Sequence, residues 1–403
     1  MEQTLLEMNR KERGAEIAKT SIITKTSDGW TVPSQSGNGK YDVKLEGFDP
    51  VCSCPDYVKR KVRCKHIFAV EMTLKKEVDS SGNMKVTQTM KVTYAQDWHN
   101  YDYCQTNEKL LFLKLLDDLC NGIEEPEYKF GRPKISKQEM IFLSALKVYS
   151  TFSLRRFMSD ASIAQEKGYI TKKPCYASIG HFMQDEELTP LLYKLIEVSA
   201  LPLSAIETKF AIDSTGFSNC RFARYFSFRH QKDIRYQTWL KVHAVVGVKT
   251  NVITNVKITQ KDASDIKEFK ELIESTAKNF KIEEVSADKA YSSRENYEIV
   301  NELGGTAFIP FKKNATGKAK GSLLWKKMYH YFEFNKEEFL QHYHLRSNVE
   351  SSFHMVKSKF RDSLRSKTVN AQTNEVLLKI LCHNICCVMQ EMKEINMKIT
   401  NKE

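Results

Sequence analysis

The chain has 403 residues, enough for two or three domains, and its 41% hydrophobic and 11% aromatic content is typical of a globular protein. Lys plus Arg (62) exceeds Asp plus Glu (50) by 12, and the pI is about 9.0, which suits a polyanionic partner such as nucleic acid without identifying one. No apolar run approaches the ~18 residues of a membrane span, and the first residues lack the pattern of a signal peptide. We therefore expect a soluble, intracellular protein in the cytoplasm, associated with the nucleoid if the source is prokaryotic, whose cysteines are mostly reduced.

Three of the ten cysteines lie close together, after a stretch of short strand signals. Residues 27–45 alternate in polarity and are broken by Gly and Ser, which predicts a hairpin. The spacing that follows is Cys52-x-Cys54-x9-Cys64-x-His66. Two close pairs of such ligands can complete a tetrahedral Zn²⁺ site. The alternative is three buried free cysteines beside an unrelated histidine, but so regular a double pair favours zinc.

This stretch resembles a SWIM-type zinc finger, because the strands, the Cys-x-Cys-Pro turn and the Cys-Lys-His-Ile ending are all present. The resemblance implies an accessory module that recognises DNA or protein. Five cations in the same stretch are equally compatible with phosphate contacts and with a solvated rim: Lys59, Arg60, Lys61, Arg63 and Lys65.

The middle of the chain is mainly helical. Residues 71–105 have few core signals and predict a linker with some strand character, and 110–119 predict a helix. Gly131–Lys134 predicts an extended break, after which 136–201 has a helical pattern that opens with the capping box Ser136-Lys-Gln-Glu139. A compact basic helical unit is compatible with helix-turn-helix DNA binding and equally with structural packing.

From residue 205 the pattern changes to alternating strands and helices. The expected order is strand, strand, strand, helix, strand, helix, strand, helix, over residues 209–217, 239–247, 252–258, 263–278, 284–288, 293–303, 306–310 and 343–360. This order is that of the α/β ribonuclease H-like fold, with a mixed five-stranded sheet and flanking helices. In that fold, acidic residues from the first strand, the fourth strand and the last helix converge at one edge. The matching positions are Asp213, Asp288 and Glu350.

These carboxylates point to divalent cations. Each Asp is expected at the end of a strand, where on its own it would often cap a turn or a helix. Three carboxylates held together repel one another unless cations lie between them, and hard ions such as Mg²⁺ or Mn²⁺ prefer oxygen ligands. Two such ions can activate a nucleophile and stabilise the leaving oxygen of a phosphodiester.

The last helix also carries an ordered polar edge. At 100° per residue, Arg346, Glu350 and Lys357 lie on one side of the helix with Tyr343 near them. An apolar stripe that includes Val349 runs beside them. An ordinary salt bridge between Arg346 and Glu350 across one turn is the simplest explanation of this pattern, if the helix is taken alone.

Residues ~205–390 resemble a DDE transposase of the bacterial and archaeal insertion-sequence type. The residues that carry the resemblance are the signature Tyr-x2-Arg-x3-Glu-x6-Lys at Tyr343, Arg346, Glu350 and Lys357, and the blocks around Asp213 and Asp288. The resemblance implies that the three carboxylates bind Mg²⁺ (or Mn²⁺) and are catalytic. It also implies that Arg346 and Lys357 contact DNA phosphate, and that Tyr343 supports DNA positioning.

The same resemblance implies a function: cleavage at the terminal repeats of the element and joining of the 3′ ends to target DNA, by a homodimer on paired ends. Two alternatives stay open, a domesticated or inactive DNA-binding protein and a metal-dependent nuclease without strand transfer. Residues 312–327, rich in lysine, could line a DNA channel with Trp325 as a stacking residue, or form a solvated loop that one aromatic anchors.

Four regions follow from these patterns. We expect a SWIM-like zinc finger with its N-terminal segment in 1–75, a linker and helix in 76–130, a helical region for DNA binding in 131–204, and the catalytic domain in 205–395. The final apolar helix, 376–392, contains three cysteines that we assign to core packing, because no nearby ligand set completes a metal site: Cys382, Cys386 and Cys387.

Overall fold

The computed structural model describes residues 10–392 and 395, apart from 11–12, 15, 19, 27–28, 36–38, 46–49, 79–83, 89–97, 126–129, 131–134, 220–238 and 261–264. The chain divides into two compact units, Met1–Gln96 and Asp97–Glu403. The extended break expected at 131–134 lies outside the described residues.

The described part of the first unit contains a small sheet and short helices. Its antiparallel sheet has the order β1-β2-β3-β4, formed by β1 (Thr24–Thr26), β2 (Gly29–Pro33), β3 (Lys40–Lys44) and β4 (Val51–Cys52). Next come α2 (Pro55–Arg60), α3 (Lys65–Thr73) and a separate hairpin of β5 (Leu74–Val78) and β6 (Met84–Gln88). The core of the unit contains Val32, Val43 and Ile67 together with the three clustered cysteines. The expected hairpin is therefore present, and a helix follows Cys64 directly.

The second unit opens with helices that pack around the chain's last helix. These helices are α4 (Trp98–Thr106), α5 (Glu108–Asn121), α6 (Lys137–Tyr149), α7 (Leu154–Glu166), α8 (Tyr176–Phe182), α9 (Leu188–Ala200) and the 3₁₀ turn η1 (Leu201–Leu203). Ser136 begins α6 as expected, because its Oγ accepts a 3.1 Å hydrogen bond from the Glu139 amide. The last helix, α16 (Val369–Glu391), packs against α5, α6 and α9. Its three cysteines are buried, in keeping with a packing role.

A mixed five-stranded sheet follows. Its elements are β7 (Lys209–Ser218), β8 (Trp239–Gly247), β9 (Ile253–Gln260), α11 (Asp265–Ala277), β10 (Glu284–Ala287), the 3₁₀ turn η3 (Lys289–Tyr291), α12 (Arg294–Glu302) and β11 (Thr306–Phe308). The strand order is β11-β10-β7-β8-β9, with β7, β8 and β9 antiparallel and β10 parallel to both β7 and β11. The expected ribonuclease H-like architecture is confirmed.

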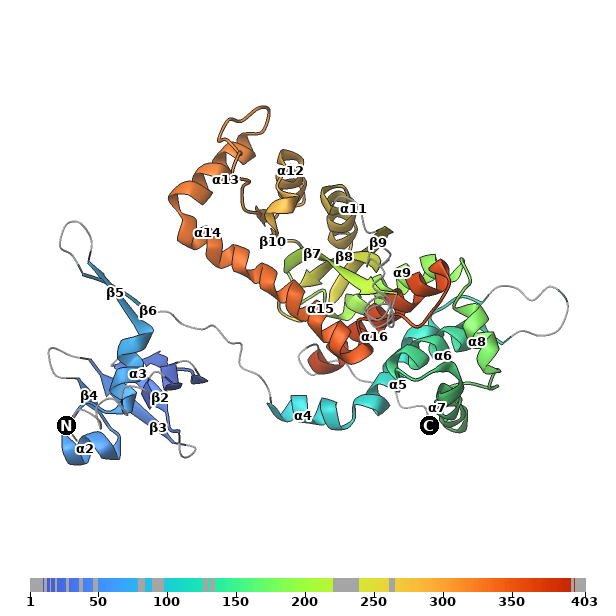
Figure 1. The fold of residues 1–403 in the computed structure, drawn as a ribbon, viewed down its shortest axis with the longest axis horizontal. Coiled ribbons are helices and arrows are strands. Elements are labelled where there is room, and N and C mark those ends of the chain that lie inside the picture. The colour runs from blue at the N-terminus through green and yellow to red at the C-terminus, as the bar shows by residue number, and fades with distance from the viewer. Residues whose placement is uncertain are drawn as a thin grey trace, which may run out of the picture. The chain divides into compact units, whose positions relative to one another are not determined.

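Helices cover both faces of this sheet (Figure 1). Along β7, Phe210 and Ile212 belong to one hydrophobic cluster, which includes side chains of α11 and α12. Ala211 and Phe217 belong to the other cluster, which includes α15 (Ser347–Phe360), α16 and the preceding helical region. Because side chains alternate across a strand, neighbouring residues of β7 serve opposite cores. The helical region and the sheet thus share one core.

Two helices between β11 and α15 were not predicted: α13 (Leu323–Phe334) and α14 (Lys336–Tyr343). The helix expected from Tyr343 to Phe360 in fact begins at Ser347, after the 3₁₀ turn η4 (His344–Arg346). The backbone stays right-handed helical through this junction, so α14, the turn and α15 run on as one long feature (Figure 1).

Trp325 in α13 is 5% exposed and packs edge-on against Phe311 and Tyr297. The interpretation of Trp325 as a DNA-stacking residue is therefore wrong, and it is a buried anchor of α13.

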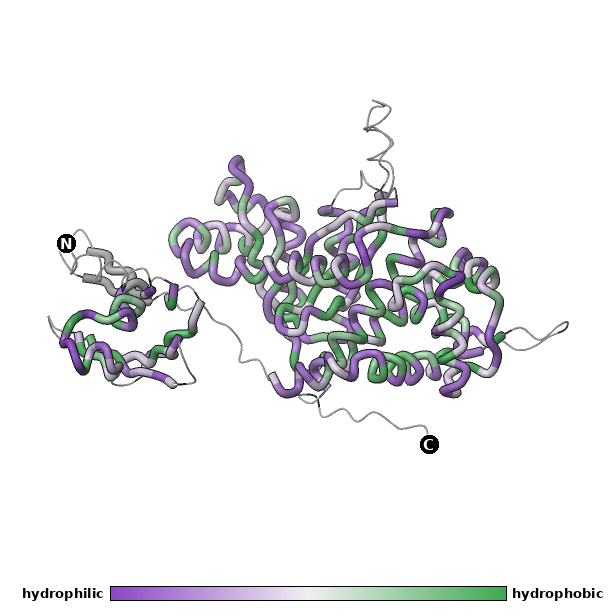
Figure 2. Tube along the Cα trace, turned by 60° about the horizontal axis from the view of Figure 1, so that its bottom comes forward, coloured by the Kyte–Doolittle hydropathy of each residue, from purple (hydrophilic) through white to green (hydrophobic). Residues whose placement is uncertain are grey.

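Hydropathy follows this layering. Hydrophobic segments concentrate inside the second unit and hydrophilic ones lie on its outer turns (Figure 2). No helix in the described part of the chain is long and apolar enough to cross a membrane.

Candidate active site and metal centre

Asp213 lies in the middle of β7, and not at a strand end as the sequence suggested. The neighbouring strand explains its position, because β10 pairs with β7 only as far as Ala287 opposite Ile212. Beyond that pair, β7 continues alone beside β8, with Asp213 opposite Ala244. The carboxylate of Asp213 is therefore at the edge where the parallel part of the sheet stops, and its side chain is 22% exposed.

Asp288 follows β10 directly, at the same edge. It caps the turn η3, where its Oδ1 accepts a 2.7 Å hydrogen bond from the Lys289 amide. Since Ala287 is in register with Ile212, Asp288 comes one step further along the sheet, as Asp213 does. Asp288 thus caps a turn, as an Asp at the end of a strand often does. The cap uses Oδ1 and leaves Oδ2 available.

Arg346 brings the third carboxylate to the first. Its Nη1 donates to Asp213 Oδ2 and its Nη2 to Glu350 Oε1, each at 2.6 Å. Glu350 is in the first turn of α15, four residues after Arg346, and its side chain is 58% exposed. The expected salt bridge between Arg346 and Glu350 is present. The same guanidinium also binds Asp213, so that it links α15 to β7.

The electrostatics of this edge follow from burial and from like charges. Burial raises the pKa of Asp213, and the negative charges of Asp288 and Glu350 raise it further. The Ser214 amide, which donates to Asp213 Oδ1 at 2.8 Å, and the Arg346 guanidinium act in the opposite direction. Burial lowers the pKa of Arg346, but the attraction of Asp213, Tyr343 and Glu350 outweighs it, so that the pKa is raised overall. One cation thus holds two carboxylates of a three-carboxylate cluster.

Lys357 lies two turns further along α15, above the same strand. Its Nζ donates a 2.6 Å hydrogen bond to Thr215 Oγ1 and lies 5.4 Å from the centre of the Phe217 ring. Asp213, Thr215 and Phe217 alternate onto one face of β7, which is the face that α15 covers. Burial lowers the pKa of Lys357. Thr215 was missed by sequence reasoning, although its spacing of two from Asp213 was the available signal.

Tyr343 ends α14 and is partly buried against the hydrophobic cluster under α11 and α12. Its ring centre lies 5.8 Å from that of His344, and its phenol is close enough to Arg346 to contribute to the raised pKa of that residue. The structure therefore brings four of the six predicted active-site residues into a chain of contacts: Asp213, Arg346, Glu350 and, through Thr215 on the same strand, Lys357. Asp288 joins them by strand register.

The carboxylate edge offers the oxygen donors that hard divalent cations prefer. These oxygens belong to three acidic groups, and the one guanidinium that two of them share balances only one of the three negative charges. A metal at this edge would compete with Arg346 for Asp213 and Glu350.

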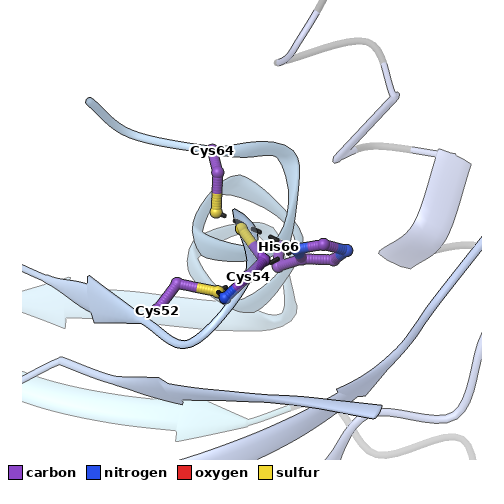
Figure 3. A group of neighbouring side chains, drawn as sticks. All are labelled: Cys52, Cys54, Cys64 and His66. Carbon is purple, nitrogen blue, oxygen red and sulfur yellow. Dashed lines mark hydrogen bonds between the residues drawn. The ribbon is translucent and has the colours of Figure 1, made fainter. Parts of the chain in front are cut away.

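The second cluster is the Cys3His group of the first unit (Figure 3). The ligand atoms of Cys52, Cys54, Cys64 and His66 all lie within 4.8 Å of one another, and all four residues are buried. His66 Nδ1 is 3.9 Å from both Cys52 Sγ and Cys64 Sγ. A hydrogen bond from Cys52 lowers the pKa of the Cys64 thiol to about 4.

Local structure builds this group from two turns. Cys52 ends β4, and Cys54 caps α2, where its Sγ accepts from the Tyr57 amide at 3.4 Å. Cys64 precedes α3 and His66 lies in its first turn. Four buried soft and borderline ligands with this spacing fit a closed tetrahedral zinc site.

Comparisons with known proteins agree with both clusters. The family model described as "Transposase DDE domain" matches residues 205–385, and the one described as "SWIM zinc finger" matches residues 41–75. No match was found among the curated proteins compared with the chain. A cryo-EM structure of a piggyBac transposase synaptic complex with hairpin DNA resembles the chain at 10% identity and a TM-score of 0.35, over 77% of this chain and 78% of that one. By these matches, residues 205–385 are similar to transposase DDE domains and residues 41–75 are similar to SWIM zinc fingers.

Proposed function

We propose that this protein is a DNA transposase that binds the terminal repeats of its own element, cleaves there and joins the 3′ ends to target DNA. The observation that carries the proposal is the meeting of Asp213 and Glu350 on one guanidinium, inside the matched transposase domain and beside Asp288. A structural ion pair needs only one carboxylate, so three at one edge favour a catalytic cluster.

In this proposal Asp213, Asp288 and Glu350 hold two Mg²⁺ or Mn²⁺ ions. When bound, such ions supply activation of a water or 3′-hydroxyl nucleophile and stabilisation of the leaving oxygen. The residues of the chain supply the positions: β7 and the end of β10 fix the two aspartates, and packing of Val349 and Phe353 fixes the helix that carries Glu350. The Glu350 side chain is 58% exposed and that of Asp213 is 22% exposed, so Glu350 is the more accessible of these two carboxylates.

Arg346 and Lys357 have a second role in this proposal. Both are cations beside the carboxylate edge. An incoming phosphate would offer the Arg346 guanidinium an anionic acceptor like its present carboxylates, and would offer the Lys357 ammonium an anion in place of the neutral Thr215 hydroxyl. Tyr343, whose phenol contributes to the raised pKa of Arg346, supports the position of the DNA. Zn²⁺ at the Cys3His group keeps the finger folded, and a homodimer holds the paired ends.

The proposal is tested by incubating the protein with a DNA fragment that carries its element ends, Mg²⁺ and a target plasmid. We expect cleaved and strand-transferred products from the native chain and at least a ~1,000-fold loss in Glu350→Gln, because the variant lacks one metal-binding carboxylate. Glu302→Gln, an exposed carboxylate in α12, is the matched control and keeps full activity.

Equal cleavage by Glu350→Gln and the native chain would refute the catalytic assignment. Cleavage without any joined product would identify a nuclease, and specific DNA binding without cleavage would identify a DNA-binding protein derived from a transposase. Asp288→Cys adds a test of metal contact, since Mn²⁺ is expected to restore more of its cleavage than Mg²⁺ does.

A further inference from the structure

A basic pocket of about 410 Å³ opens beside the Cys3His group of the finger. All of its lining belongs to the first unit. The lining includes His66, two of the clustered cysteines and five charged side chains: Arg10, Arg13, Asp56, Arg60 and Lys65. The pocket is separate from the carboxylate edge, so the proposed chemistry does not account for it.

His66 contributes an unusual group to this lining. The residue is 3% exposed, and its Nδ1 faces the cysteine sulfurs at 3.9 Å. Its other ring nitrogen, Nε2, points away from the sulfurs (Figure 3). Nε2 is buried and has no hydrogen-bond partner among the described residues. Buried polar atoms of this kind are rare, because each unpaired one costs about 1–3 kcal/mol.

Zinc ligation fixes which proton this nitrogen carries. A neutral imidazole that binds a metal through Nδ1 has its one ring proton on Nε2, so Nε2 is a hydrogen-bond donor. Metal-ligating histidines almost always give that second N–H to an acceptor. In this finger the Tyr41 ring lies beside the imidazole, with centroids 4.7 Å apart, and no described residue accepts a hydrogen bond from Nε2. A ligand in the pocket that His66 lines can supply the acceptor.

The charge of the lining selects an anion as that acceptor. Arg10, Arg13, Arg60 and Lys65 against Asp56 leave a net charge of 4 − 1 = +3. Zinc with three thiolates and a neutral imidazole carries −1, so the pocket and the metal centre together stay positive.

The cations that line the pocket differ in whether their side chains already have a hydrogen-bond or ion-pair partner. Arg10 is paired with Asp56 at 3.0 Å, and Lys65 Nζ donates to Gln35 Oε1 at 2.9 Å. Arg13 is exposed and has no side-chain partner among the residues that the structure describes. Arg13 is therefore the cation most available to a ligand.

We propose that this pocket binds a backbone phosphate of DNA, held by the N–H of His66 Nε2 and by Arg13, so that the zinc site and the DNA contact share one histidine. This proposal rests on the proposed function, because it takes DNA as the partner. It involves none of the proposed catalytic residues. A phosphate oxygen is the acceptor that both an imidazole N–H and a guanidinium prefer. The side chains of Arg60 and Arg13 at the pocket's rim are solvent-exposed, which suits a continuous strand passing over it.

The test uses the full zinc-loaded chain and a fluorescent DNA duplex, with anisotropy measured over a range of salt concentrations and zinc content measured in parallel. His66→Cys keeps a fourth zinc ligand and removes the N–H, and Arg13→Gln removes the free cation. Lys59→Gln, which removes an exposed cation of α2 outside the pocket lining, is the control. Inorganic phosphate at constant ionic strength is the competitor that separates a free-phosphate site from a backbone site.

We expect His66→Cys to keep one zinc per chain and to bind DNA about 5- to 10-fold more weakly, since a charge-assisted hydrogen bond is lost. Arg13→Gln should lower the slope of log K against log salt by about one, and Lys59→Gln should change the affinity less than about twofold. Native DNA affinity in zinc-loaded His66→Cys would overturn the proposal. If that variant loses zinc, equal effects of Arg13→Gln and Lys59→Gln would overturn it.

A free-phosphate site would give a different result. Millimolar phosphate would then compete in the native chain but not in Arg13→Gln, and Arg13→Gln would keep its DNA affinity. That result would also overturn the DNA assignment. Because binding is measured without cleavage, these outcomes are independent of the strand-transfer test. A catalytically dead Glu350→Gln chain should show the same His66 and Arg13 effects.

Discussion

Arg346 donates a hydrogen bond of 2.6 Å to Asp213, although the two residues lie 133 positions apart in the chain. The same guanidinium reaches Glu350 at 2.6 Å, so it occupies the place between two proposed metal ligands. The sequence alone suggested only the contact within the helix. The bridge gives the carboxylate edge a cation of its own, with which a metal bound by Asp213 and Glu350 would compete.

The first prediction concerns this bridge. Arg346→Gln should destabilise the protein in EDTA by about 1–3 kcal/mol, because two carboxylates at one edge lose their shared cation. Mg²⁺ should reduce this difference, since the metal replaces the guanidinium between the acids. Thermal unfolding in EDTA and in Mg²⁺ measures both effects. A loss of stability that is the same with and without Mg²⁺ would mean that metal and Arg346 do not share the site.

The second prediction separates two roles of Lys357. If the ammonium contacts DNA phosphate, Lys357→Met should weaken DNA binding and lower the salt slope by about one. Thr215→Val removes only the acceptor that holds Lys357 at 2.6 Å and should keep DNA affinity within about threefold. Equal losses of affinity in the two variants would assign Lys357 to packing of α15 on β7.

The third prediction concerns the Cys3His group. Cys64→Ser should release about one zinc ion per chain, because a ligand of the four is lost, and should expose the finger to proteolysis. Cys175→Ser replaces an exposed cysteine outside the cluster and should keep the zinc. Metal analysis after gel filtration measures both. Unchanged zinc content in Cys64→Ser would refute the site.

The fourth prediction concerns the loop after α15. Lys379 is 2% exposed, and its Nζ donates at 2.9 Å to the carbonyl oxygens of Arg361 and Ser363. This loop also joins β7, because the Leu364 amide donates to the Ser218 carbonyl at 2.8 Å. Lys379 therefore helps to fix the helix that carries Glu350 on the strand that carries Asp213.

Burial lowers the pKa of Lys379 to about 8 from 10.5. Between these two values the folded state binds fewer protons than the unfolded state, so the free energy of unfolding rises with pH across this window. The rise is on the order of 3 kcal/mol and should be missing in Lys379→Met. Denaturant unfolding of both proteins near pH 7 and near pH 10 measures it. A difference between the two proteins that is constant over the window would contradict the lowered pKa.

Much of the architecture was predictable because it depends on local pattern. Alternating and helical periodicities gave the order of the strands and helices from β7 to β11, and that order corresponds to one known sheet topology. The Ser136 cap and the four finger ligands were predictable for the same reason, since each group sits within a few residues of its partners or on a fixed turn. Local spacing could also place Glu350 four residues from Arg346.

The sequence by itself determined which groups this protein has and in what order: the Cys3His spacing, the two aspartates, and the helix with its arginine, glutamate and lysine. Only the tertiary structure decided what those groups contact. Pairing of β7 with β8 beyond the last β10 pair set Asp213 in mid-strand, and packing buried Trp325. The Arg346 that forms the helical salt bridge with Glu350 also reaches Asp213. The physical reason is range, because periodicity and capping act over a few residues, whereas these contacts depend on which distant surfaces bury one another.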